Sequence, residues 1–205
     1  MKGGETMDLK KLEKNLKARG FDYYYATDAE DAVRHILEQV QNTSVGIGGS
    51  TTADQLGLYD RLTETNQVHW HWKEGPKPEV YQAAAEAEVY ISGVNGLAES
   101  GEVVNIDGKG NRVAALSYAV GKRIFLVAGR NKVCPDLPAA IERARNVAAP
   151  KNLLRFPGTR PCTDTQKCWD CRSKDRSCCT MQIMMFKPMQ SKKVELILID
   201  EDLGY

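Results

Sequence analysis

Apolar residues recur along most of the chain with either a helical or a strand period. Residues 9–16 carry leucines at helical spacing and Gly20 follows as a stop, which predicts a first helix; residues 29–40 carry the next helical stripe. We expect strands over residues 21–26, 44–47, 89–94, 123–128, 180–186 and 194–199. This alternation predicts an α/β fold with a mostly parallel sheet, helices on both faces and an antiparallel addition.

Two segments depart from this alternation. Residues 102–107 and the turn Gly108-Lys109-Gly110 are predicted to form the stem and tip of a hairpin. Residues 157–179 lose apolar periodicity and contain five cysteines, so we predict an irregular Cys-rich insertion before the C-terminal strands. A length of 205 residues suits one domain, and we predict a single domain over residues 1–205.

The charge and hydropathy of the chain limit the kinds of partner and the compartment that we expect. A formal net charge of +1 provides no global field for attracting nucleic acid, so no nucleic-acid partner is expected. The apolar runs 124–128 and 196–199 are far shorter than the roughly 20 residues of a membrane helix, so no membrane span is expected. Residues 1–17 show no export signal, which predicts a cytoplasmic protein with reduced cysteines.

Three predicted strand ends carry residues suited to binding an anion. Residues 48–52 form a glycine and hydroxyl turn before a predicted helix, residues 92–101 contain two glycine turns around one acid, and residues 129–132 are cationic. Open parallel sheets bind ligands beyond the carboxyl ends of their strands. The recurrence of such ends favours one small-molecule site over ordinary loop chemistry.

These segments resemble the LUD (lactate-utilisation) domain family. The resemblance runs in order from about Asp8 to Leu154 and rests on residues 48–50, 95–104, 110–116 and 129–132. It implies a fold similar to the ribose-phosphate isomerases and CoA transferases. It also implies a component or accessory role in the oxidation of lactate to pyruvate with iron-sulfur partner proteins. From this resemblance together with the strand-end turns, we expect the ligand to be a small anionic metabolite or a nucleotide-like molecule.

The resemblance also suggests roles for particular residues. Glu99 is the candidate catalytic residue, because a glutamate in that region of CoA transferases is a nucleophile; a loop-capping carboxylate is the alternative. The absence of a clear Ser-Glu-Asn-Gly segment argues against transferase chemistry. The candidate ligand-binding residues are Gly48, Gly49, Ser50, Thr51, Asn95, Gly96, Gly101, Arg112, Asn131 and Lys132.

The cysteines of the insertion indicate a metal site. Cys162, Cys168, Cys171, Cys178 and Cys179 follow the pattern C-x5-C-x2-C-x6-C-C. The C-x2-C pair suits one tetrahedral ion, and zinc is the leading prediction. An iron-sulfur cluster is the second alternative because the spacing departs from the ferredoxin run, and reduced thiols in a flexible loop are the third.

Three hypotheses of function follow. The leading one is a lactate-utilisation protein that binds an anionic ligand at the strand ends. The second is a non-catalytic assembly or docking factor for an iron-sulfur partner. The third is an enzyme of the isomerase or acyl-transfer type.

Overall fold

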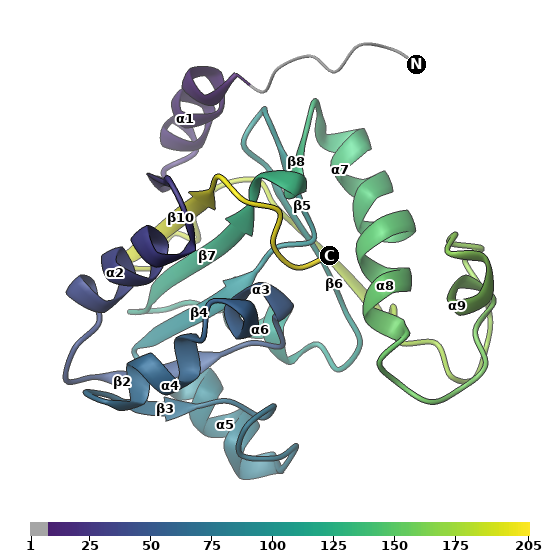
Figure 1. Cartoon of the computed structure of the whole chain (residues 1–205), viewed down its shortest axis with the longest axis horizontal. Helices are drawn as coiled ribbons and strands as arrows, with labels where there is room; N and C mark the ends of the chain where they lie inside the picture. Colours follow the sequence, from purple (N-terminus) through teal and green to yellow (C-terminus); the bar gives the residue numbers. More distant parts are fainter. Residues whose placement is uncertain (1–7) are drawn as a thin grey trace.

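The core of the fold is a parallel sheet of six strands in the order β1-β10-β7-β4-β2-β3 (Figure 1). The computed structural model describes residues 8–205. The strands are β1 (Asp22–Ala26), β2 (Ser44–Ile47), β3 (Gln67–His69), β4 (Val89–Gly93), β7 (Arg123–Gly129) and β10 (Lys193–Ile199). The predicted α/β fold with a mostly parallel sheet is confirmed. Strand β10, the last in the chain, lies inside the sheet between β1 and β7.

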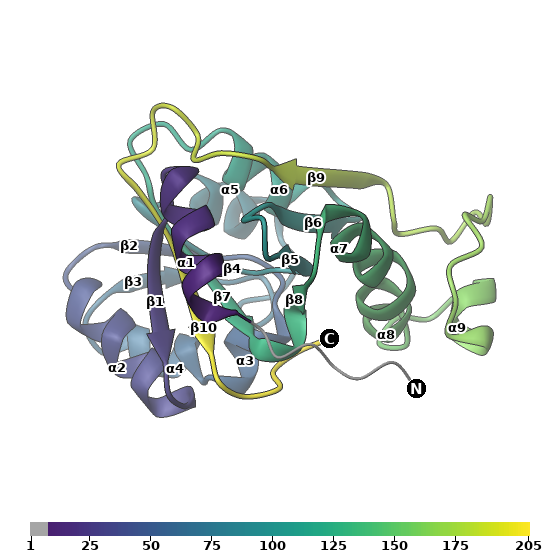
Figure 2. The same ribbon diagram turned by 90° about the horizontal axis from the view of Figure 1, so that it is seen from above.

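Helices cover both faces of this sheet. Side chains alternate along its buried strands, so both faces of the sheet are apolar and need cover. Phe125 and Val127 of β7 pack in one core, whereas Ile124, Leu126 and Ala128 pack in the other. Figure 2 shows α2, α3 and α4 on one side of the sheet and α5 and α6 on the other. The helices are α1 (Leu9–Ala18), α2 (Ala29–Gln39), α3 (Thr51–Gln55), α4 (Leu58–Thr63), α5 (Pro78–Glu86) and α6 (Asn111–Ser117).

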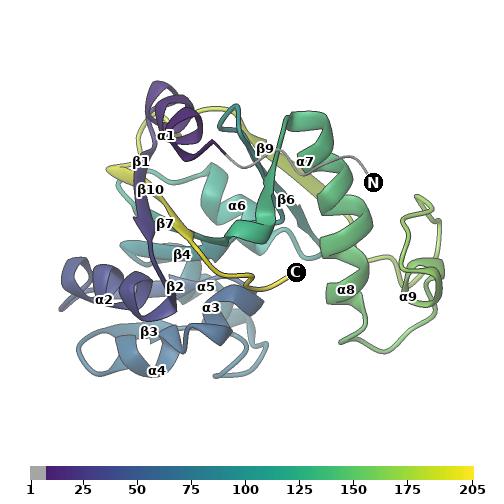
Figure 3. The same cartoon turned by 45° about the horizontal axis from the view of Figure 1, so that its top comes forward.

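A second, mixed sheet of four strands packs against the second of these cores and has the order β8-β5-β6-β9 (Figure 2). Figure 3 shows its strands β6 and β9 beside α7. Its strands are β5 (Gly96–Ala98), β6 (Val103–Asp107), β8 (Val133–Cys134) and β9 (Thr180–Met184). Strand β6 is antiparallel to both β5 and β9. A continuous helical segment covers this sheet. It comprises α7 (Leu137–Arg143), a π-helical turn (Ala144–Ala148) and α8 (Ala149–Leu153).

The predicted hairpin tip at Gly108-Lys109-Gly110 is wrong. Strand β6 does form a hairpin, but with β5 before it, and its antiparallel partner after Gly110 is the distant strand β9. The chain instead enters α6, because the Asp107 carboxylate accepts hydrogen bonds from the backbone N–H groups of Arg112 (2.9 Å) and Val113 (3.1 Å). Gly110 at φ 81° provides the left-handed turn before the helix.

Residues 157–179 leave the sheet as the sequence predicts. They contain one short helix, α9 (Pro161–Thr165), which packs against α8, and then irregular chain up to β9. Figure 1 shows α9 beyond α8, away from the main sheet. We call residues 157–179 the cysteine insertion. Within residues 8–205 no helix is long and apolar enough to cross a membrane.

Candidate anion-binding site

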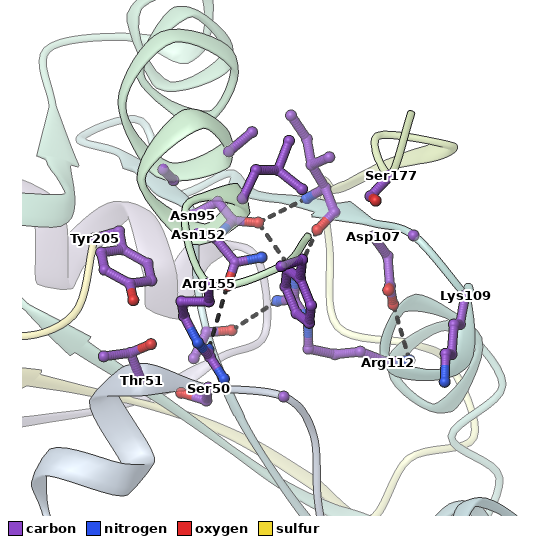
Figure 4. A pocket seen from close by; sticks show the side chains of 18 of the residues that line it. Ser50, Thr51, Asn95, Asp107, Lys109, Arg112, Asn152, Arg155, Ser177 and Tyr205 are labelled. Atoms are coloured by element: carbon purple, nitrogen blue, oxygen red, sulfur yellow. Dashed lines mark hydrogen bonds between the residues drawn. The ribbon is translucent and has the colours of Figure 1, made fainter. Parts of the chain in front are cut away.

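A cavity of about 1020 Å³ opens at the carboxyl edge of the main sheet. Ser50 and Thr51 follow β2, Asn95 follows β4, and Lys132 follows β7, so three strand ends reach one space. Arg112 enters from α6, and further walls come from α8, the cysteine insertion and Tyr205 (Figure 4). The volume is at the upper end of the roughly 300–1000 Å³ usual for small-molecule sites.

The lining of this cavity is strongly cationic. Seven lysine and arginine side chains contribute to it, against two carboxylates. Both carboxylates have partners inside the protein: Asp54 pairs with Lys73 at 2.9 Å, and Asp107 caps α6. The seven cations are Lys73, Lys109, Arg112, Lys132, Arg155, Arg160 and Arg176. Lys73 is balanced by Asp54, and Arg176 is balanced by Asp170 at 2.9 Å. No ion pair among the described residues involves the other five cations, which favours an anionic ligand.

Arg112 is a buried cation held only by neutral oxygens. Its guanidinium donates to the side-chain oxygens of Asn105 (2.6 Å) and Asn95 (3.2 Å), and to the carbonyls of Ile106 (2.7 Å) and Gly93 (3.1 Å). Arg112 takes part in no ion pair within residues 8–205. Burial lowers its pKa, yet the side chain stays charged. An anion at this guanidinium would compensate a charge that the fold leaves unpaired.

Lys132 is a second buried cation at the same edge, with 2 % of its surface exposed. Its ammonium donates to the main-chain oxygen of Tyr205, and no ion pair of the described residues involves it. Burial, together with the positive charges of Arg143, Lys151 and Arg112, lowers the pKa of Lys132 to about 7. Lys132 therefore changes charge near neutral pH, and a bound anion would favour its charged form.

An aromatic wall faces this basic edge. The guanidinium of Arg155 stacks on Trp72, with 3.8 Å between its Cζ and the ring centroid, and Trp70 stacks on Trp72 at 5.3 Å. His71 also lines the cavity, and burial and the charge of Lys109 lower its pKa. The stack holds the Arg155 side chain in place at the wall of the cavity.

The turn after β2 packs closely on the end of β4. A Cβ on Gly93 would lie 2.5 Å from Ser50 Oγ, so only glycine fits there without movement. The Ser50 hydroxyl accepts a hydrogen bond from the backbone N–H of Ala53 at 3.1 Å and so caps α3. The predicted turn residues Gly49, Ser50 and Thr51 all line the cavity, and so do Asn95, Arg112 and Lys132.

Other residues singled out from the sequence lie outside the cavity lining. Gly48 packs on the Arg112 side chain, where a Cβ would lie 3.0 Å from Cδ, and so supports the site indirectly. Gly96 packs against Ala140, and Gly101 packs against Arg19. Asn131 donates to the Gly204 carbonyl at 3.5 Å, and its own side-chain oxygen is buried without a hydrogen-bond partner.

Glu99 lies beside α1 and does not line the cavity. Its carboxylate pairs with Lys11 at 2.9 Å, its backbone N–H donates to the Cys134 carbonyl, and Asn15 donates to its carbonyl. These contacts tie the β5–β6 hairpin to α1. The catalytic role of Glu99 stays a prediction that the cavity does not support.

Several residues that line the cavity were not predicted from the sequence. Lys109 belongs to a turn mistaken for a hairpin tip, Arg155 follows α8, and Arg160 and Arg176 belong to the cysteine insertion. None follows a strand of the main sheet, so a rule based on strand ends does not find them. The signal available in the sequence was the density of arginines in and before the insertion.

The insertion brings four of its five cysteines to a second, smaller pocket. Cys162, Cys168, Cys171 and Cys178 line it, whereas Cys179 lines the large cavity. Burial, and then the neighbouring Cys162 and Cys168, raises the pKa of Cys178 to about 11. Within residues 8–205 no three His, Cys, Asp or Glu side chains form a group that could hold a metal ion. The metal expected from the sequence stays a prediction.

The structure is that of an α/β protein with a cationic cavity at the carboxyl ends of parallel strands. The chain belongs to the LUD domain family, whose family model matches residues 9–199. The resemblance noted from the sequence is thus confirmed.

A solved structure shows the same fold. The chain is similar to a DUF162 family protein from Deinococcus radiodurans, with a TM-score of 0.55 and 13% identity over 93% of this chain and 95% of that chain. A match to eIF2B beta from Chaetomium thermophilum has 14% identity over 63% of this chain and 43% of that chain, but its TM-score of 0.30 is too low to support an argument. No curated protein matches the chain.

Proposed function

We propose that this chain is a lactate-utilisation protein that binds an anionic ligand in the cavity at the carboxyl edge of its sheet. In this proposal it serves as a component or accessory of the iron-sulfur-dependent oxidation of lactate to pyruvate. Membership of the LUD domain family supports that setting. The binding function is supported by the cavity itself.

The observation that carries the proposal is the pair Arg112 and Lys132. Both side chains are buried at the cavity. The Arg112 guanidinium donates only to neutral oxygens, and the Lys132 ammonium donates to the main-chain oxygen of Tyr205. Keeping a buried cation without a carboxylate partner is unfavourable, and an anionic ligand removes that penalty on binding. A carboxylate or phosphate group suits both side chains, because each offers N–H donors to an oxyanion.

The size of the cavity adds a second element. Lactate and pyruvate would fill a small part of about 1020 Å³. Lys109 and Arg155 also line the cavity and are able to bind a second anionic group. A larger ligand with more than one anionic group, such as a nucleotide-like molecule, would use these positions as well.

Titration calorimetry with lactate, pyruvate, coenzyme A and ATP tests the proposal. We expect at least one of them to bind to the parent chain, and Lys132→Gln to weaken that binding. Lys192→Gln is the matched control, because it removes the same charge from an exposed position outside the cavity lining. Absence of binding by all four ligands, or equal weakening in both variants, would contradict the assignment.

The setting in lactate oxidation needs a separate test. Deleting the gene should impair growth on lactate but not on pyruvate, and the parent gene should restore growth. Equal growth of the deletion strain on both carbon sources would remove this part of the proposal while leaving anion binding in place.

A further inference from the structure

Lys132 is the buried end of a short turn after a central strand of the main sheet. The 3-10 turn Arg130–Lys132 follows β7 directly and delivers the Lys132 side chain to the large cavity. Arg130, at the start of the same turn, is half-exposed and pairs with Asp202 (3.2 Å) and Asp200 (3.4 Å). The turn therefore places an arginine at the surface and a lysine inside the site.

The Lys132 nitrogen has one hydrogen-bond partner among the described residues. It donates to the main-chain oxygen of Tyr205, and a Cβ on Gly204 would lie 3.1 Å from Nζ, so the segment 201–205 passes directly beside this nitrogen. That segment contains no helix or strand. Within residues 8–205 no hydrogen-bond donor contacts Nζ, so the lone pair of the neutral amine is free to attack an electrophile.

A large share of Lys132 is neutral amine at physiological pH. Burial and neighbouring cations lower its pKa to about 7, so about half of the side chains carry no charge at pH 7. An exposed lysine with a pKa of about 10.4 is neutral in roughly one molecule in 2500 at that pH. Lys132 therefore presents a free amine roughly a thousandfold more often, which is the state in which lysines attack carbonyl carbon.

The same cavity provides a cation for a carboxylate. Arg112 lines it, is fixed by four hydrogen bonds to neutral oxygens and contributes to the lowered pKa of Lys132, so the two side chains lie within electrostatic reach of each other. A 2-oxo acid carries a carboxylate and, on the adjacent carbon, an electrophilic ketone. With its carboxylate at the arginine, the ketone would meet the amine in a fixed orientation, which favours the reaction.

We propose that Lys132 forms an imine with the ketone carbon of a 2-oxo acid, of which pyruvate is the simplest case with a methyl group. This inference rests on the anion-binding function proposed above and deepens it, because it makes Lys132 a nucleophile as well as a binding residue. The geometry also explains why a lysine occupies this position: an arginine would supply the charge but not the attacking lone pair.

The reaction is a condensation that releases one water molecule. The nitrogen lone pair attacks the ketone carbon, the C=O π pair moves to oxygen, and that oxygen takes a proton from solvent. The carbinolamine then loses water as nitrogen forms the C=N bond. The protonated imine carries the same single positive charge as the ammonium, so proton uptake on binding is the same as for an ion pair. It draws electrons from the neighbouring bonds of the bound acid, as other covalent lysine intermediates do.

Reduction with sodium cyanoborohydride in the presence of pyruvate tests the proposal, because it converts the imine to a stable secondary amine. Intact-mass analysis should show the mass of one pyruvic acid less one oxygen atom on most chains, and peptide mapping should place it at Lys132. Labelling should saturate at the pyruvate concentrations at which calorimetry shows binding. Lactate, which carries the carboxylate without the ketone, should give no adduct.

Two variants locate the reactive amine. Lys132→Gln should lose the adduct while circular dichroism shows the parent fold. The matched control Lys192→Gln removes an exposed lysine outside the cavity lining and should be labelled like the parent.

Three results would overturn the proposal. Pyruvate that binds in calorimetry without forming an adduct would remove the imine and leave the anion-binding function in place. Absence of both binding and adduct would also remove the imine, and the proposed function would fail with it only if lactate, coenzyme A and ATP do not bind either. An equal yield of adduct in Lys132→Gln, or adduct spread over exposed lysines, would assign the labelling to ordinary surface amines.

Discussion

Anion binding in the large cavity should depend on the protonation of Lys132. Burial and three neighbouring cations lower its pKa to about 7, so the free protein holds this lysine about half charged at pH 7 and about one-tenth charged at pH 8. If the anion binds only the charged form, its dissociation constant rises about fivefold between pH 7 and pH 8. A further rise of about tenfold follows between pH 8 and pH 9. Binding should then take up roughly 0.9 proton at pH 8.

Titration calorimetry with pyruvate measures both quantities. Pyruvate keeps its charge over this pH range, and His71 adds nothing because its pKa is already lowered from 6.5. Titrations in two buffers with different ionisation enthalpies report the proton uptake. Lys132→Gln should bind weakly with no dependence on pH, and Lys192→Gln should behave like the parent.

The reasoning fails if the dissociation constant stays the same from pH 7 to pH 9 with no proton uptake. It also fails if Lys132→Gln keeps the pH dependence of the parent, because another group would then be responsible.

Three further predictions concern the walls of the cavity. Arg112→Gln should weaken pyruvate binding by roughly ten- to a hundredfold, because it removes a charge-assisted hydrogen bond worth about 1.5–3 kcal/mol. The pH dependence of binding should stay the same, and calorimetry at several pH values measures both effects. Trp72→Ala should release Arg155 and weaken anion binding by about two- to fivefold, from a cation–π contact of about 0.5–1 kcal/mol. In a double-mutant cycle, Arg155→Ala should add nothing to this effect. Gly93→Ala should lower the free energy of unfolding in urea by about 1–3 kcal/mol, because its Cβ would lie 2.5 Å from Ser50 Oγ; an unchanged urea midpoint would show that the turn moves freely.

Local patterns in the sequence were sufficient to predict the class of fold. Buried strands such as β7 and β10 are short apolar runs, and the helices between them carry one apolar stripe each, so a parallel sheet covered on both faces followed. The order of the strands in the sheet could not be predicted from these patterns. Pairing β10 with both β1 and β7 is a contact between segments far apart in sequence, and no local period encodes it.

The site was predicted only as far as it lies at strand ends. The turn at residues 49–51 and Lys132 were found because they follow strands of one parallel sheet, whose carboxyl ends meet at one edge. Arg155 and Arg160 reach the cavity through the packing of α8 and the cysteine insertion, which sequence periodicity does not describe. Glu99 was selected by family likeness, but it lies beside α1 in an ion pair with Lys11.

A crystal structure of the chain with pyruvate, lactate or coenzyme A tests the central claim most directly. The account predicts that the carboxylate or phosphate of the bound molecule lies in the large cavity, in contact with the Arg112 guanidinium and the Lys132 ammonium. A bound molecule whose anionic group contacts neither side chain, or a cavity that stays empty with all three at saturating concentration, would contradict it.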